Sequence, residues 1–201
     1  MILVWLSLIL FLPGVSAQQI SSGRRCIEPG KGQFLILVGS SGLFSMFGHD
    51  HTIEAKEIAG CAEVEGGDLT RSSVELTFPA NKITVLDPKD SASDRAKVQE
   101  QMDTDVLRIQ EFPSIRFRST GVRRTQGREN AIMVDGQLTI RDRTQTVAIP
   151  VEIGSAGDGS TRVRGEYSLR QTAFGITPVR VAGGAVRVKD EVKVRFELYL
   201  R

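Results

Sequence analysis

The chain has 201 residues, a formal net charge of +2 and 40% hydrophobic residues, which is enough for one domain with its own core. Its 26 Lys and Arg residues are interspersed with 24 Asp and Glu residues, so the charge pattern argues against a nucleic-acid partner. Beyond the N-terminal segment, no apolar stretch approaches the roughly 20 residues of a membrane-spanning helix. We therefore expect a soluble protein without stable membrane insertion.

The N-terminus has the pattern of a secretory signal peptide. Residues 2–12 are almost all apolar, a Pro-Gly pair ends this run, and residues 15–17 are small, as a signal peptidase requires. We expect residues 1–17 to be cleaved and the protein to be periplasmic or secreted. No Lys or Arg precedes the apolar run, which leaves an uncleaved anchor as the alternative. Residues 18–32 are then expected to form a mobile leader, and residues 33–201 the folded domain.

Cys26 and Cys61 are the two cysteines of the chain. In an oxidising compartment they can form one disulfide that closes a loop of about 35 residues and stabilises the fold by roughly 3 to 4 kcal/mol. Two unpaired buried thiols are the alternative.

Most of the domain alternates apolar and polar residues, which is typical of half-buried β-strands. The first strand is expected near Phe34–Val38, and the clearest alternation covers Val192–Leu200. Polar or Gly-rich segments separate consecutive runs, so the neighbouring strands should be antiparallel. These segments are Gln126–Asn130, Arg141–Thr144 and Ser155–Ser160.

One segment, Ser93–Gln110, has a helical pattern instead. It lacks Gly and Pro and places Val98, Met102, Val106 and Ile109 at helical spacing, with Ser93 as the expected N-cap. About eight strands with one short helical insertion favour a closed antiparallel barrel, because closure removes exposed strand edges. Gly136 and Gly165 are expected on its inward face, where small residues would leave room for a ligand.

Both histidines of the chain lie in the string Gly48-His49-Asp50-His51. In an extended strand His49 and His51 point to the same face, as a metal site with two His ligands requires, but a complete site needs a further Asp, Glu or Cys from elsewhere. The alternative is that the two imidazoles bond to the backbone or line the mouth of a pocket.

No sequence motif of a known catalytic centre is present. The chain has no Gly-x-Ser-x-Gly elbow, no HExxH helix and no phosphate-binding Gly-rich loop, so we do not expect an enzyme. Apolar residues in irregular segments are more informative. Phe44, Phe47, Phe112 and Phe174 either complete the core or line an apolar channel near one end of the barrel.

Several segments resemble the YceI-like, polyisoprenoid-binding family. The resemblance rests on Glu111–Thr120 at a helix-to-strand junction, on Gly136–Ile140 with Thr144–Val147 in a hairpin, on Arg170–Gly175, and on the closing strand Val188–Leu200. Gly48–His51 also matches a form seen in part of the family. It implies a lipocalin-like barrel, exported to the periplasm, with a long isoprenoid or fatty amide in its lumen and no established metal or catalytic group.

Two positions depart from the family pattern. Arg141-Asp142 stands where the family often has a His, and Leu169 replaces the Asn that precedes Arg170. A different ligand is expected if either position contacts the ligand's head group.

We therefore predict an all-β, lipocalin-like, eight-stranded antiparallel barrel that carries or stores a long-chain amphiphile, needs no cofactor, and leaves homodimer formation open. The alternatives are a metal-dependent enzyme or metal-binding protein that uses His49 and His51, and a barrel with a filled lumen that acts through its surface. The residues expected to bind the ligand are Phe44, Phe47, His49, His51, Met102, Phe112, Phe117, Gly136, Leu138, Tyr167, Arg170, Phe174 and Phe196.

Overall fold

The structure, a computed structural model, describes residues 21–41, 50–128, 130–181 and 186–201. The predicted signal peptide and three of the expected ligand contacts, Phe44, Phe47 and His49, lie outside these residues. The strands are β1 (Gly23–Ser41), β2 (His51–Ala55), β3 (Ala59–Val64), β4 (Ser73–Pro79), β5 (Ile83–Val85), β6 (Ser114–Arg124), β7 (Ala131–Ile140), β8 (Arg143–Ser155), β9 (Thr161–Arg170), β10 (Arg180–Val181) and β11 (Val186–Leu200).

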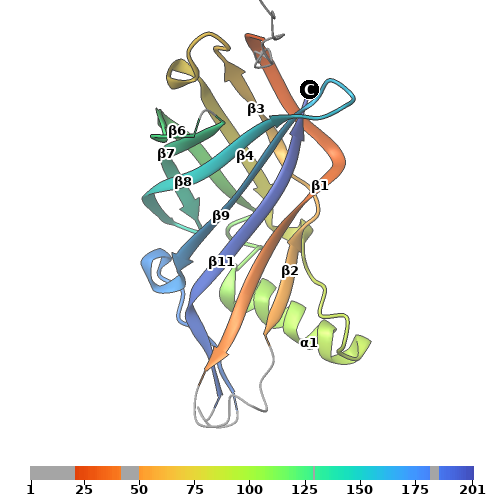
Figure 1. Cartoon of the computed structure of the whole chain (residues 1–201). Helices are drawn as coiled ribbons and strands as arrows, with labels where there is room; N and C mark the ends of the chain where they lie inside the picture. Colours follow the sequence, from red (N-terminus) through yellow and green to blue (C-terminus); the bar gives the residue numbers. More distant parts are fainter. Residues whose placement is uncertain (1–20, 42–49, 129, 182–185) are drawn as a thin grey trace, which may run out of the picture.

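A closed barrel of eight antiparallel strands dominates the described part of the chain, as predicted (Figure 1). Around the ring the order is β1, β3, β4, β6, β7, β8, β9 and β11, and the pairing of β11 with β1 closes it. The strands from β6 to β9 follow one another through the three predicted turn segments. The short strands β2, β5 and β10 extend the sheet at one end of the barrel.

The first strand is much longer than predicted. β1 begins at Gly23, and its first part pairs with β3 while its second part pairs with β2. The prediction of a leader over residues 18–32, with strand structure beginning near Phe34, is therefore wrong from Gly23 onwards. This segment forms a strand although its sequence does not alternate. Backbone pairing on both sides holds it, together with a disulfide between Cys26 and Cys61, which lie directly opposite each other.

The predicted helical insertion is present. It consists of α1 (Ala92–Gln101) and a π-helical segment (Met102–Val106), and it lies beside β2 at one end of the barrel (Figure 1). Met102 is buried in a cluster with residues of β2, β4 and β5, and Val98 packs against that cluster. The N-cap is Ser91, whose hydroxyl accepts a hydrogen bond from the Asp94 amide, so the prediction of Ser93 was two residues too late. Among the described residues, no helix is long and apolar enough to cross a membrane.

Candidate ligand-binding site

The barrel encloses an apolar cavity of about 710 Å³. All eight strands of the ring contribute side chains to its wall, and nearly all of these side chains are hydrophobic. The volume lies in the range of roughly 300 to 1,000 Å³ that small-molecule sites occupy. The lumen is therefore hollow, and the alternative of a barrel filled by its own side chains is wrong.

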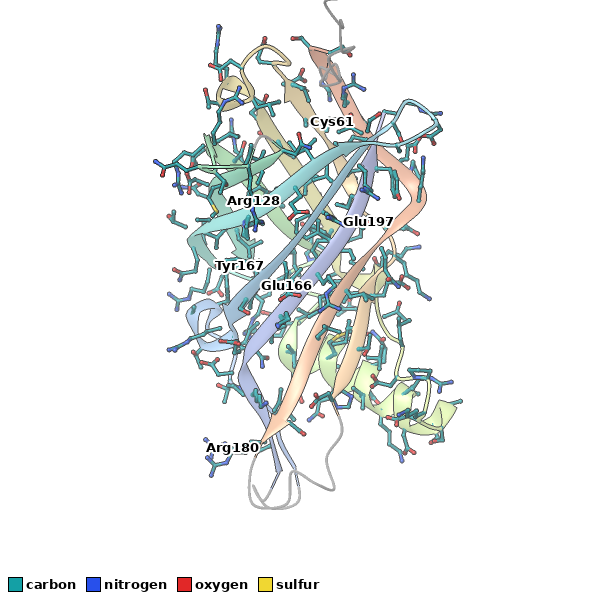
Figure 2. All side chains as sticks on the ribbon, viewed as in Figure 1. Cys61, Arg128, Glu166, Tyr167, Arg180 and Glu197 are labelled. Atoms are coloured by element: carbon teal, nitrogen blue, oxygen red, sulfur yellow. A yellow bond between two sulfur atoms is a disulfide. The ribbon has the colours of Figure 1, made fainter. Side chains whose placement is uncertain are left out.

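The cavity is long and follows the barrel axis. On β9 alone, its wall includes residues from Thr161 to Leu169, which span about 26 Å of strand at roughly 3.3 Å per residue. Thr161 pairs with Leu200, which pairs with Ile27 next to Cys26, so it is at the end of the barrel that holds the disulfide. The wall also includes Val179, next to Arg180, and Figure 2 shows Cys61 and Arg180 at opposite ends. Inward residues such as Val194 are only half-buried, because they face the hollow interior. A cavity of this form suits an extended apolar chain.

Three phenylalanines form one aromatic group in the wall. The Phe34 ring lies 4.8 Å from the Phe78 ring and 5.8 Å from the Phe196 ring, measured between ring centroids. All three residues line the cavity. Phe34 and Phe78 were not among the expected ligand contacts. Phe78 belongs to an alternating run with Val74 and Leu76 that places it on the inward face, whereas Phe34 begins a run that is apolar throughout and so gives no face by alternation.

The two inward glycines do not provide room for a ligand. A Cβ atom on Gly136 would lie 2.5 Å from the Phe117 ring and 2.7 Å from the Arg118 carbonyl oxygen. A Cβ atom on Gly165 would lie 2.6 Å from the Phe196 ring. Aromatic rings from neighbouring strands therefore cover both glycines, and the expectation that these positions leave open space is wrong.

Six of the expected contact residues line the cavity, and four do not. The first group comes from β2, the π-helical segment, β6, β7, β9 and β11. Its members are His51, Met102, Phe117, Leu138, Tyr167 and Phe196. The residues that the structure places elsewhere are Phe112, Gly136, Arg170 and Phe174.

The two phenylalanines placed elsewhere have other partners. Phe112 lies near the surface close to the guanidinium groups of Arg108 and Arg141, which are 5.5 and 5.9 Å from its ring centroid. Phe174 is 2% exposed and packs in a separate small cluster. Neither ring is therefore available to a ligand in the lumen.

The two departures from the family pattern lie in different places. Arg141 and Asp142 form the turn between β7 and β8 and are not part of the cavity wall. Leu169, in contrast, lines the cavity. Arg170 is exposed on the outer face, because strand alternation places it opposite the inward Leu169. Of the two departures, the substitution at Leu169 is therefore the one that changes the cavity wall.

The polar groups of the wall are few. Tyr167 projects from β9 into the apolar cavity, and partial burial raises the pKa of its phenol. At the end of the barrel near β10, the wall includes His51 and Arg187. The polar head of a ligand would therefore meet an imidazole and a guanidinium group at this end, whereas the opposite end offers the hydroxyl groups of Ser72, Ser73 and Thr161.

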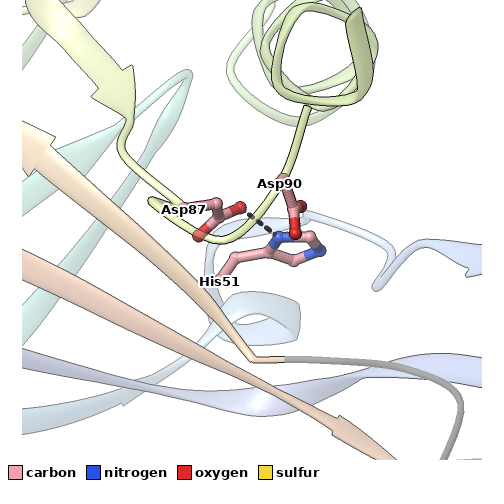
Figure 3. Close-up of side chains that lie close together, drawn as sticks. All are labelled: His51, Asp87 and Asp90. Carbon is pink, nitrogen blue, oxygen red and sulfur yellow. Dashed lines mark hydrogen bonds and ion pairs between the residues drawn. The ribbon is translucent and has the colours of Figure 1, made fainter. Parts of the chain in front are cut away.

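His51 also belongs to a small polar cluster with Asp87 and Asp90 (Figure 3). The Nδ1 atom of His51 lies 2.6 Å from Oδ2 of Asp87, and the Asp87 side chain is only 3% exposed. Both aspartates lie in the loop between β5 and α1, whereas His51 begins β2. The two aspartates were not among the site residues expected from the sequence. The signal for them is the string Asp87-Pro88-Lys89-Asp90, because Asp followed by Pro favours a tight turn that brings its first and fourth residues together.

The sequence pattern of the YceI-like domain matches residues 38–200, which is most of the chain. The chain belongs to the YceI-like family. No curated protein matches it.

Solved structures of YceI-like and related proteins share the fold. BcnA from Burkholderia cenocepacia is 19% identical, with a TM-score of 0.68 over 86% of this chain and 98% of that one. A polyisoprenoid-binding domain from Saccharophagus degradans is 9% identical, with a TM-score of 0.61 over 90% of this chain and 99% of that one. The YceI protein of Campylobacter jejuni is 12% identical, with a TM-score of 0.55 over 73% and 82% of the two chains. At these identities the likeness establishes the barrel fold alone.

Proposed function

We propose that this YceI-like protein binds a long-chain amphiphile, such as a polyisoprenoid, in the lumen of its barrel and carries or stores it without catalysing a reaction. The observation that carries the proposal is the long apolar cavity of about 710 Å³. Membership of the YceI-like family and the fold shared with a polyisoprenoid-binding domain support it.

The apolar wall supplies the driving force for binding. Removal of apolar surface from water contributes about 25 cal/mol per Å², so several hundred Å² of buried tail give ample favourable free energy before the cost of ordering the chain. The aromatic group of Phe34, Phe78 and Phe196 would contact the tail. Tyr167 and the polar groups near His51 would orient oxygen atoms of the ligand.

Export is part of the proposal. The disulfide between Cys26 and Cys61 supports it, because disulfides persist mainly in oxidising compartments such as the periplasm or the extracellular space. Mass spectrometry of the mature protein from its host would test export directly, through the mass expected after cleavage behind Ala17.

A pair of substitutions on β11 tests the lipid-binding proposal. Val194 lines the cavity and is half-buried, whereas its neighbour Lys193 is exposed on the outer face. We expect Val194→Trp to fill part of the lumen and to abolish uptake of a fluorescent long-chain lipid. The matched variant Lys193→Trp adds the same side chain outside the barrel and should bind the lipid like the wild type.

Circular dichroism and thermal unfolding would first establish that both variants are folded. Native mass spectrometry of the wild type, followed by organic extraction, would then identify the ligand that co-purifies. Undiminished lipid uptake by a folded Val194→Trp variant would contradict binding in the lumen.

A further inference from the structure

We propose that His51, Asp87 and Asp90 form a binding site for one divalent cation, best suited to Zn²⁺, at the end of the barrel near α1 (Figure 3). Each residue offers one ligand atom, and these atoms all lie within 4.8 Å of one another. The proposal does not depend on the proposed lipid ligand, although His51 also lines the cavity.

Backbone contacts hold the two aspartates in place. The Thr52 amide donates a hydrogen bond of 2.7 Å to Oδ1 of Asp87, which leaves the second carboxylate oxygen directed at His51. The Asp90 amide donates to the Asp87 carbonyl at 3.0 Å, and the Leu86 amide donates to the Thr52 carbonyl at 2.8 Å. The loop is therefore tied to β2, and the position of the Asp87 carboxylate does not depend on a bound ion.

The ligand set matches the chemistry of zinc. Zn²⁺ takes imidazole nitrogen and carboxylate oxygen atoms at about 2.0 to 2.2 Å, and sites with three protein ligands keep one position open for another molecule. Two carboxylates close to one imidazole carry a local negative charge even when His51 is protonated, and a divalent cation would compensate it.

Only a small movement is needed to admit the ion. Two ligand atoms on a tetrahedral zinc ion lie about 3.3 Å apart, so the 2.6 Å contact between His51 and Asp87 has to open by less than about 1 Å. Ligand atoms that lie as much as 4.8 Å apart have to approach by about 1.5 Å. Asp87 is buried and anchored, whereas the His51 side chain is 21% exposed at the start of β2. We therefore expect the imidazole to move and the carboxylate to stay.

Calorimetric titration of the chelator-treated, lipid-extracted protein with ZnCl₂ tests the site. The wild type should bind one Zn²⁺ ion per chain. His51→Gln and Asp90→Asn should each weaken the affinity at least about tenfold. Asp105→Asn is the matched control, because Asp105 is an exposed aspartate of the neighbouring π-helical segment, and it should bind zinc like the wild type.

Two results would overturn the proposal. One is a wild type without stoichiometric zinc binding. The other is undiminished binding in folded His51→Gln and Asp90→Asn variants, including a case in which only His49→Ala abolishes it. Lipid uptake is measured separately with the substitutions on β11, so failure of the metal site and failure of the lipid site give different results.

Discussion

Gly136 and Gly165 show how closely the barrel wall is packed around its hollow centre. Both glycines face inward, and each is covered by an aromatic ring from a neighbouring strand, Phe117 over Gly136 and Phe196 over Gly165. An aromatic ring that packs against a glycine compensates for the side chain that the glycine lacks. The two phenylalanines therefore shape the wall, and the glycines allow them to lie against it.

Substitution of Gly136 should destabilise the barrel. The Cβ atom of Gly136→Ala would overlap both the Phe117 ring and the Arg118 carbonyl oxygen, so we expect the free energy of unfolding to fall by about 1 to 3 kcal/mol. Gly121→Ala is the control, since a Cβ atom on this β6 residue has no heavy atom within 4 Å and its effect should stay within about 0.5 kcal/mol. Urea denaturation of the three proteins measures both effects, and equal stability of the two variants would contradict this account.

For a single residue, the sequence predicts which face of the strand it is on but not which side chain of a neighbouring strand packs against it. Alternation correctly assigns Gly136 to the inward face, yet the position of the Phe117 ring depends on packing between strands, which no local pattern contains. The contact between His51 and Asp87 is equally hard to predict from the sequence, because the two residues are 36 positions apart in the chain.

At the scale of elements, α1 begins at a residue that the sequence pattern places slightly too late. Ser91 and Ser93 are both polar residues at the start of the helical segment, and either can act as an N-cap by type. The structure selects Ser91, whose hydroxyl oxygen accepts a hydrogen bond from the Asp94 amide at 3.1 Å. Such an error of two residues is expected, because the ends of elements depend on individual hydrogen bonds.

The two serines provide a direct test of the cap. Ser91→Ala should lower the free energy of unfolding by about 1 kcal/mol, because the Asp94 amide loses its acceptor. Ser93→Ala lies within the exposed first turn of α1 and should leave the stability nearly unchanged. Thermal and urea unfolding compare the variants, and a larger loss for Ser93→Ala would place the cap at that residue instead.

The strands differ in how well the sequence predicts them. Val192–Leu200 alternates along its whole length and lies in β11 as expected, because one of its faces meets the apolar cavity. The first part of β1 has no such pattern, since backbone pairing and the disulfide hold it. Alternation in the sequence indicates that one face of a strand is buried. It therefore does not reveal a strand that is held by backbone pairing and a disulfide.

At the scale of the whole molecule, a hollow barrel should gain stability from its ligand. A ligand that binds only the folded state at about 100 times its Kd adds roughly 2.7 kcal/mol to the free energy of unfolding. For a domain of this size, that corresponds to a rise in Tm of roughly 5 to 10 °C. Lipid-extracted wild type should show this rise when the co-purified lipid is added back, as measured by calorimetry.

The Val194→Trp variant is the control for this measurement, because its lumen is partly filled and its Tm should not respond to the lipid. A wild type whose Tm is unchanged by saturating lipid would contradict the proposed binding in the lumen.

The closure of the ring by β1 and β11 has a consequence for the order of folding. Ile27 pairs with Leu200, so the barrel cannot close until nearly the entire chain has been synthesised. Cys26 and Cys61 are only 35 residues apart and lie on paired strands, so their bond can form while most later strands are still absent. The disulfide would then hold β1 beside β3 while the other edge of β1 is still unpaired. The last strand, β11, would close the barrel when it pairs with that edge.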